Sequence, residues 1–202
     1  MFMSKLFLDI ETIPVEKEKH PVLKEVYDRA LSDGKKPGTF EEYVLQTSFD
    51  GAFGRIICLG WAVNDEKIQS MSGDEKKILE KFWELSRNTD LFIGFNLLDF
   101  DLRFIYQRSV IVGVKTSEIS LAYYRNNPVF DVMWEWTKWK KPTAKLDTLA
   151  KALGLESSKG GSIEGKDVAQ AYEEGRIREI CEYCEKDVEL TRKIYKRLTF
   201  SD

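Results

Sequence analysis

The stretch Lys5-Leu-Phe-Leu-Asp-Ile-Glu11 has the composition of a β-strand and carries two carboxylates at its end. Alternate side chains of an extended strand share a face, so Asp9 and Glu11 point to the same side as Phe7. The apolar residues facing the other side are Leu6, Leu8 and Ile10. Two adjacent carboxylates raise each other's pKa and are costly to bury unless a cation lies between them. The strand therefore predicts the floor of a divalent-metal site, the alternative being two acids at a solvent-exposed strand end.

Length and composition indicate one globular domain. The chain has 202 residues, of which 43% are hydrophobic and 32% charged, enough for one well-formed core and little more. With 31 Lys and Arg against 34 Asp and Glu, the net charge is -3, so there is no overall basic field of the kind that binds nucleic acid by phosphate neutralisation alone. An enzyme that holds a nucleic-acid end through metals needs only local positive charge. The oligomeric state does not follow from composition.

Neither a membrane segment nor a metal-binding cysteine cluster is expected. No apolar run approaches the ~18 residues of a membrane span, and the N-terminus lacks an apolar signal core. Cys181-x-x-Cys184 has no second cysteine pair or histidine cluster to complete a zinc site. We interpret Cys58, Cys181 and Cys184 as structural thiols in a cytoplasmic protein, which also argues against a thiol redox protein.

The order of predicted elements indicates a mixed sheet flanked by helices. A long polar stretch at about 15–54, with helical periodicity near 22–31 and 40–45, is predicted to be a peripheral insertion, either a lid over the site or an inert surface element. The other expected strands are Arg55–Val63 and Lys67–Met71, paired as a hairpin, Leu91–Phe95 and Val129–Met133. The expected helices are Glu75–Ser86, one from Asp99 or Phe100 to Gln107, and helices from Lys145 onward that end with Arg176–Leu198.

Two further motifs add acids to the pair in the first strand. Asn96-Leu-Leu-Asp-Phe100-Asp101 places a carboxylate at a strand-to-helix junction, where open α/β sheets commonly keep their sites. Tyr183 and Asp187 lie four residues apart, on one edge of the apolar stripe of the last helix. They can therefore project together where that helix meets the sheet.

These motifs, in this order, resemble the three exonuclease motifs of the DEDD superfamily, DEDDy branch. Phe130-Asp131, Lys145-Leu-Asp147 and Tyr183-Cys-Glu-Lys-Asp187 are similar to segments of the 3'-5' exonuclease domains of family B DNA polymerases and of their stand-alone relatives, the predicted PolB-like 3'-5' exonucleases. The likeness covers roughly residues 5–13 and 55–198. The other branch would have histidine at position 182, which is Glu here; His20, the single histidine, lies in a charged run.

The resemblance implies a ribonuclease H-like fold, with a central mixed five-stranded sheet, for a single exonuclease domain spanning 1–202. It implies two divalent ions, Mg²⁺ or Mn²⁺, one held by Asp9, Glu11 and Asp187 and the second by Asp9 with Asp101. Tyr183 would orient the attacking water. Asn96 and Phe100 would position the terminal nucleotide, although core packing explains Phe100 as well.

The expected reaction is hydrolysis at the 3' end of single-stranded nucleic acid, with DNA favoured over RNA. The alternatives are a 3'-5' exoribonuclease of the same branch and a catalytically silent nucleic-acid-binding domain on the same fold. A triphosphatase is excluded because the loop Gly160-Gly-Ser-Ile-Glu-Gly165-Lys166 has Asp167 where a phosphate loop has Ser or Thr. That loop, with Lys159 and Lys166 among small residues, is interpreted as a solvated segment, the alternative being a mobile loop near the substrate backbone.

Two softer signals remain open. Aromatic residues alternate with lysines at Trp134, Trp136, Trp139 and Lys138, Lys140, Lys141, Lys145. This pattern is typical of a surface that stacks unpaired bases, and equally of an amphipathic helix with buried Trp and exposed Lys. Asp131 and Asp147 are expected to form a helix cap or a hydrogen bond at a strand end, the alternative being additional acids near the site.

Overall fold

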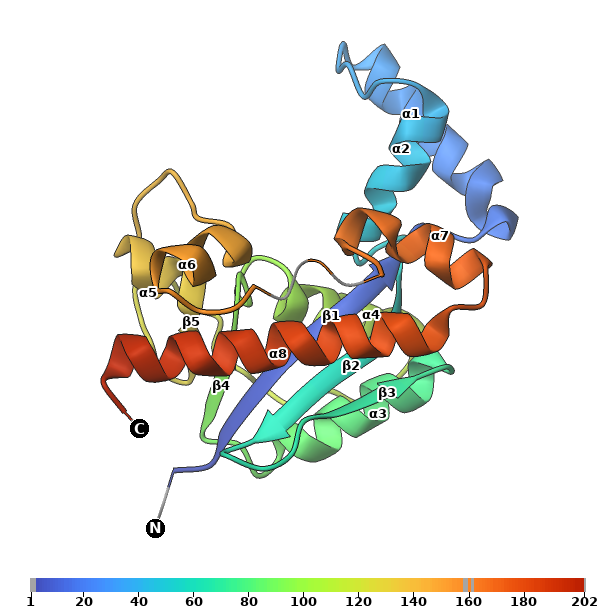
Figure 1. The fold of residues 1–202 in the computed structure, drawn as a ribbon. Helices are drawn as coiled ribbons and strands as arrows, with labels where there is room; N and C mark the ends of the chain where they lie inside the picture. Colours follow the sequence, from blue (N-terminus) through green and yellow to red (C-terminus); the bar gives the residue numbers. More distant parts are fainter. Residues whose placement is uncertain (1–2, 158–159, 161, 202) are drawn as a thin grey trace.

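The strands form one mixed sheet within residues 3–157, 160 and 162–201, which the computed structural model describes (Figure 1). The strands are β1 (Lys5–Ile13), β2 (Arg55–Val63), β3 (Gln69–Ser72), β4 (Leu91–Gly94) and β5 (Val129–Asp131). Their order in the sheet is β3-β2-β1-β4-β5. β2 is antiparallel to both of its neighbours, β1 and β3, whereas β1, β4 and β5 run parallel to one another. The prediction of a mixed five-stranded sheet is confirmed.

Helices cover both faces of the sheet, as its alternating side chains require. On one face, Leu6, Leu8 and Ile10 of β1 belong to a buried cluster with α3 (Glu75–Ser86) and α4 (Asp101–Val112). The opposite face packs against α8 (Ile177–Thr199), which crosses the front of the sheet in Figure 1. The shorter helices are α5 (Val132–Thr137), α6 (Leu146–Ala152) and α7 (Val168–Glu173). None of the helices in the described part of the chain has the length and apolar character needed to cross a membrane.

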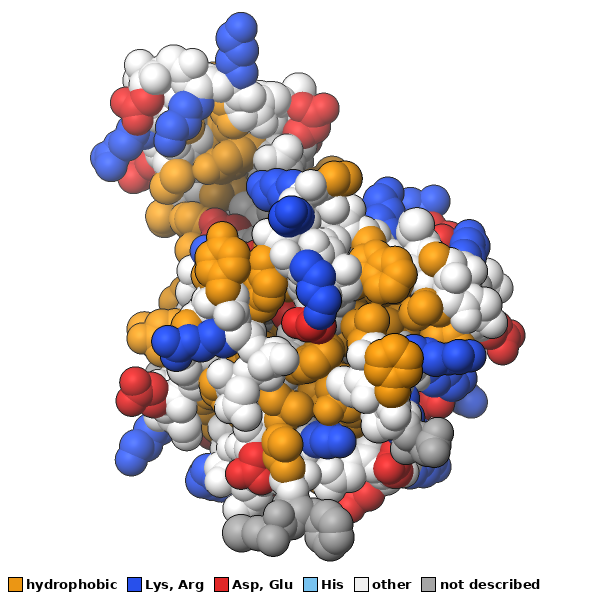
Figure 2. All heavy atoms as spheres, turned by 90° about the vertical axis from the view of Figure 1, so that its left-hand side faces the viewer, with side chains coloured by type: hydrophobic (Ala, Val, Ile, Leu, Met, Phe, Trp, Pro, Cys, Tyr) orange, Lys and Arg blue, Asp and Glu red, His pale blue; other side chains and the backbone are white. Residues whose placement is uncertain are grey.

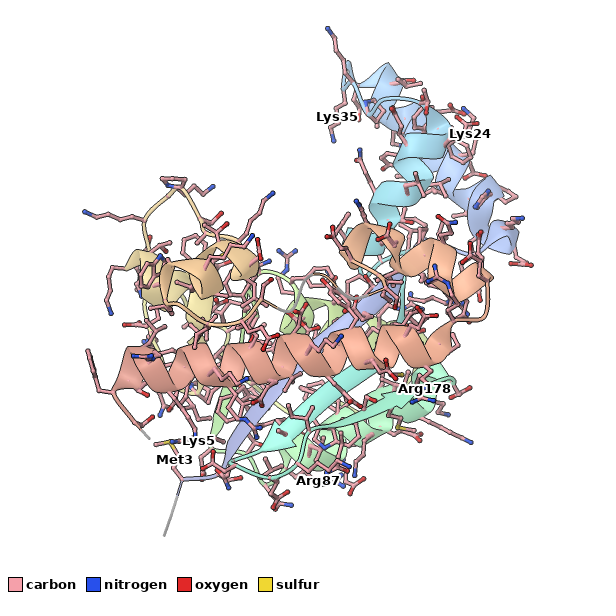
Figure 3. The ribbon with its side chains drawn as sticks, in the orientation of Figure 1. Met3, Lys5, Lys24, Lys35, Arg87 and Arg178 are labelled. Carbon is pink, nitrogen blue, oxygen red and sulfur yellow. The ribbon has the colours of Figure 1, made fainter. Side chains whose placement is uncertain are left out.

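The stretch at about 15–54 forms α1 (His20–Ser32) and α2 (Phe40–Gln46), which stand away from the sheet (Figure 1). Lys24 and Lys35 lie on this outlying part (Figure 3). Tyr27 holds the two helices of this part together. Its ring lies edge-on to Phe40 with centroids 5.4 Å apart, and the Tyr27 hydroxyl donates to the Gly38 carbonyl at 2.8 Å. We name α1, α2 and the connecting turn the helical arm.

The helical arm joins the sheet next to the end of β1. The Val15 N–H donates to Thr47 Oγ1 at 2.9 Å, and Thr12 Oγ1 donates to the Ser48 carbonyl at 2.6 Å. Phe49, at the base of the arm, lies 6.2 Å from the Phe100 ring, measured between centroids. The arm is thus anchored to the strand that carries Asp9 and Glu11.

The last strand is shorter than expected. The prediction of a strand over Val129–Met133 is wrong at its end, because β5 stops at Asp131 and α5 begins with Val132. The Asp131 carboxylate accepts hydrogen bonds from the N–H groups of Met133, at 3.0 Å, and Trp134, at 3.3 Å. It is the N-cap of α5, and such a cap favours a helix over a longer strand. The expected cap at Asp131 is confirmed.

Candidate active site

The face of β1 that carries Asp9 and Glu11 is covered by α8. Gly60 of β2 lies opposite Asp9 in the antiparallel pair. A Cβ atom on Gly60 would lie 2.8 Å from Cys184 Sγ of α8, so glycine is needed for this close approach. The Asp9 side chain is half-buried under the helix, and Glu11 is buried.

Asp101 enters the same space from the first turn of α4. Its Oδ1 atom accepts a hydrogen bond from the backbone N–H of Ile10 at 3.1 Å. Ile10 stands between Asp9 and Glu11 in the strand, so this bond holds the Asp101 carboxylate beside both. The Asp101 side chain is only 2% exposed. A carboxylate buried to this degree requires compensation by hydrogen bonds or a cation.

The electrostatics of the site show that Asp187 of α8 joins the three other carboxyl groups. Burial raises the pKa of Asp9 well above its ordinary value, and repulsion from Asp101, Glu11 and Asp187 raises it further. Burial also raises the pKa of Glu11, with Asp187 and Asp101 as the next causes. The four carboxyl groups therefore destabilise each other's charged forms.

Tyr183 lies in the same field, one helical turn before Asp187. Burial raises the pKa of the Tyr183 hydroxyl, and the negative charges of Asp187, Glu11 and Asp9 raise it further. A Cβ atom on Gly165 would lie 3.6 Å from this hydroxyl oxygen. The segment before α7 therefore approaches the site. The phenol stays protonated at neutral pH, so it can donate and accept hydrogen bonds but does not act as a base.

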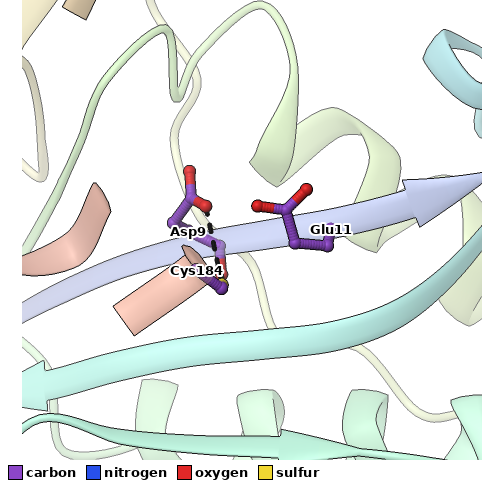
Figure 4. A group of neighbouring side chains, drawn as sticks. All are labelled: Asp9, Glu11 and Cys184. Atoms are coloured by element: carbon purple, nitrogen blue, oxygen red, sulfur yellow. Dashed lines mark hydrogen bonds between the residues drawn. The ribbon is translucent and has the colours of Figure 1, made fainter. Parts of the chain in front are cut away.

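Carboxylate oxygens are the best metal ligands in this cluster. Within the described residues, ligand atoms of Asp9, Glu11 and Cys184 lie within 4.8 Å of one another (Figure 4). Cys184 Sγ lies 3.4 Å from the Asp9 carbonyl oxygen and 3.5 Å from Asp9 Oδ2, as a donor to both. Burial raises the pKa of the Cys184 thiol well above its ordinary value, which favours the protonated donor seen in these contacts. The donor set fits a hard, oxygen-binding cation such as Mg²⁺ or Mn²⁺.

The three cysteines form one group beneath the carboxylates. Cys58 and Cys184 are buried, Cys181 is half-buried, and the sulfur atoms of Cys58 and Cys181 are 3.6 Å apart. All three are free thiols. The expectation of structural thiols agrees with these positions. The contact between Cys184 and Asp9 had no signal in the sequence, where Cys184 belonged to the apolar stripe of the helix.

Asn96 lies in the loop between β4 and α4, and Asp131 fixes the backbone of this loop. The N–H groups of Asn96 and Leu98 donate to the Asp131 carboxylate at 3.1 and 3.0 Å. Asn96 has a left-handed backbone with φ of 60°, a conformation that asparagine tolerates better than most residues. Burial raises the pKa of Asp131 to about 6, although the backbone hydrogen bonds oppose this rise. Asp131 thus positions the loop, a role that its place at a strand end only partly indicated.

Phe100, the residue before α4, is half-buried between the helical arm and the core. Its ring centroid lies 5.5 Å from that of Phe104 and 6.2 Å from that of Phe49. Core packing therefore accounts for much of this side chain. The structure thus brings together the four acids and Tyr183, with Asn96 and Phe100 at either end of the loop that leads to Asp101.

The chain resembles known proteins both in sequence and in structure. Residues 56–202 match the model of a family described as predicted 3'-5' exonucleases related to the exonuclease domain of PolB. An uncharacterized protein of Methanocaldococcus jannaschii is 27% identical over 153 residues, covering 71% of this chain and 85% of that protein. The structure of the family B DNA polymerase from Pyrobaculum calidifontis superposes with a TM-score of 0.70 at 16% identity. That match covers 98% of this chain, which spans about a quarter (25%) of the polymerase chain.

Proposed function

Because the chain belongs to the family of predicted 3'-5' exonucleases related to the exonuclease domain of PolB, we propose that it removes nucleotides from the 3' end of single-stranded nucleic acid. We propose DNA as the preferred substrate and two divalent ions, Mg²⁺ or Mn²⁺, as cofactors. The whole of residues 1–202 would act as a single exonuclease domain, with the helical arm as its peripheral insertion.

One observation supports this proposal most: four carboxyl groups from β1, α4 and α8 meet in one partly buried space. Burial, and after it repulsion from neighbouring carboxylates, raises the pKa values of Asp9, Glu11 and Asp101. Holding these groups and Asp187 in their charged forms therefore costs folding free energy. A catalytically silent scaffold would gain stability by losing any one of them. The presence of all four carboxyl groups is explained if they bind cations, which offset their mutual repulsion.

The residues present suggest a division of roles. Asp9, Glu11 and Asp187 would hold one ion, and Asp9 with Asp101 would hold the second, directly or through water. Such a pair of ions supplies an activated water and stabilises charge on both oxygens of an in-line displacement at phosphorus. Tyr183, whose phenol is protonated at neutral pH, would orient the attacking water through its hydroxyl.

Substrate positioning would come from the loop between β4 and α4. Asn96, fixed through its backbone by Asp131, can hydrogen-bond the terminal nucleotide. Phe100, half-buried and next to Asp101 in the chain, would support the neighbouring nucleotide. With a net charge of -3, the protein would hold its substrate by such local contacts rather than by a general basic surface.

The decisive test is a degradation assay on single-stranded DNA and RNA of the same sequence, each labelled at the 5' end. With Mn²⁺ or Mg²⁺ we expect a ladder shortening from the 3' end, no reaction with chelator, and faster loss of DNA than of RNA. Asp187→Asn should abolish the ladder, while Asp65→Asn, at an exposed acid outside the four-acid cluster, should not. Faster loss of RNA would assign the protein as an exoribonuclease, and no degradation of either strand would contradict the proposed function.

A further inference from the structure

A pocket of about 720 Å³ opens beside Asn96, on the β4 and β5 side of the four acids. Its volume is in the range typical of small-ligand sites. Its aromatic lining consists of Phe95, Tyr123, Tyr124, Trp134 and Trp139. Lys141 and Lys145 also line it. The pocket combines ring surfaces with positive charge, and neither the family match nor the comparisons give it a role.

The rings of the pocket are held in a fixed arrangement. Trp134 and Trp139 stack with centroids 5.8 Å apart and planes 6° from parallel. Tyr123 lies edge-on to both, with centroid distances of 6.5 and 6.3 Å. The Asp99 carboxylate accepts hydrogen bonds from the Tyr123 hydroxyl and from Trp134 Nε1, the latter at 2.9 Å. These contacts preorganise an aromatic surface before any ligand binds.

Backbone conformations in the pocket are unusual for such large residues. Trp139 has φ of 63° and Tyr124 has φ of 61°, the left-handed region that bulky side chains rarely adopt. Tyr124 is 77% exposed and still lies 5.4 Å from the Trp139 ring. Strained conformations of this kind concentrate at binding sites. An exposed ring held against a stacked pair has little value for the core, and it suits a flat ligand.

The pocket lies next to the strand that carries the first two acids. β4, which ends at Gly94, pairs in parallel with β1, the strand of Asp9 and Glu11. Phe95 and Asn96, the first residues after β4, line the pocket. The loop that they begin leads to Asp101, so the pocket and the acidic cluster share this loop. On the face that carries α5 and α6, hydrophobic side chains lie among Lys and Arg (Figure 2).

We propose that this pocket binds an unpaired base of the substrate strand, on the 5' side of the bond that is cut, with Tyr124 and Trp139 stacking on it. Lys141 and Lys145 would contact the adjoining phosphates. The inference rests on the proposed function, because it names how that same site holds its substrate. Sequence-tolerant stacking with neighbouring lysines is the usual means of holding single strands.

The test compares Tyr124→Ala with a matched control, Tyr106→Ala, which removes a 51% exposed tyrosine from α4 outside the pocket. The substrates are the p-nitrophenyl ester of thymidine 5'-monophosphate, too short to reach the pocket, and single-stranded DNA of two to six nucleotides. A third set carries one abasic nucleotide at successive positions from the 3' end. We measure kcat/KM with Mn²⁺, and quenching of tryptophan fluorescence by the hexanucleotide in chelator.

We expect Tyr124→Ala to lower kcat/KM about tenfold for the longer strands and to leave ester hydrolysis within twofold. In the wild-type protein, an abasic nucleotide at one position should lower kcat/KM by the same factor. With that substrate, Tyr124→Ala should lower kcat/KM no further. Equal behaviour of Tyr124→Ala and Tyr106→Ala, or an equal loss on the ester, would overturn the inference. Failure of the wild-type protein to hydrolyse any substrate would instead contradict the proposed function. Fluorescence quenching by the hexanucleotide would then test the pocket by itself. If Tyr124→Ala does not reduce this quenching, the inference is also overturned.

Discussion

Replacing Glu11 by glutamine should stabilise the metal-free protein while removing its response to divalent ions. Glu11 is 8% exposed, and its carboxylate lies within 4.8 Å of that of Asp9, measured between ligand oxygens. Two unit charges at this distance repel by about 3.5 kcal/mol if the effective dielectric constant is about 20. Glu11→Gln removes this repulsion and keeps the shape of the side chain.

The net gain is smaller than the repulsion, because the buried amide group must also find hydrogen-bond partners, at a cost of about 1–2 kcal/mol. We therefore expect a net stabilisation of about 2 kcal/mol in chelator at pH 8. For a chain of 202 residues, each kcal/mol shifts Tm by about 2–4 °C. The variant should accordingly melt roughly 4–8 °C above the wild type.

The gain should depend on pH in a definite direction. The folded-state pKa of Glu11 is raised above its ordinary value of 4.5, so the folded protein binds more protons than the unfolded chain above that pH. Its stability therefore falls as the pH rises through the interval between the two pKa values. The advantage of Glu11→Gln should be largest at pH 8 and should disappear near pH 4.

The assay is thermal unfolding, followed by circular dichroism, of the wild type, Glu11→Gln and the exposed control Glu25→Gln, each in chelator and in Mn²⁺. Mn²⁺ should raise the wild-type Tm more at pH 8 than at pH 5, and should shift the Tm of Glu11→Gln much less. A variant less stable than the wild type at pH 8 in chelator, or a gain that does not change with pH, would refute the reasoning that repulsion dominates this site.

Three other changes test separate parts of the site. Tyr183→Phe should keep metal-dependent stabilisation and lower the single-turnover rate roughly 10²-fold; an unchanged rate would mean that the ring only packs. Asp131→Ala removes the acceptor of four backbone N–H groups and should cost at least about 3 kcal/mol in denaturant unfolding, whereas a loss below about 1 kcal/mol would contradict its positioning role. Replacing residues 18–50 by a short Gly/Ser linker should preserve cooperative melting and weaken single-strand binding; unaltered affinity and product lengths would show that the helical arm is not a lid.

Local periodicity explains how much of the fold the sequence predicts. The two-residue period of β1 separates Leu8 from Asp9, and the helical period of α8 sets Tyr183 and Asp187 on one edge. These are properties of neighbouring residues, so β1, β2, α3 and α8 were predicted to within a few residues, whereas α4 runs to Val112, beyond the expected end at Gln107. The end of β5 was missed because a single side chain, Asp131, caps the following helix, and the apolar run through Met133 did not reveal it.

Tertiary structure alone decided which of these residues meet. The bond from the Ile10 N–H to Asp101 spans 91 positions, and the contact of Cys184 with Asp9 spans 175. The ordered motifs identified the acids, and their family resemblance implied one site, but no local pattern carries the distances, the burial or the repulsion that raises their pKa values. The same holds for Tyr124 and Trp139, whose rings are brought together by left-handed turns outside any regular element. Contacts between distant segments depend on how whole elements pack, and that packing is a property of the complete chain.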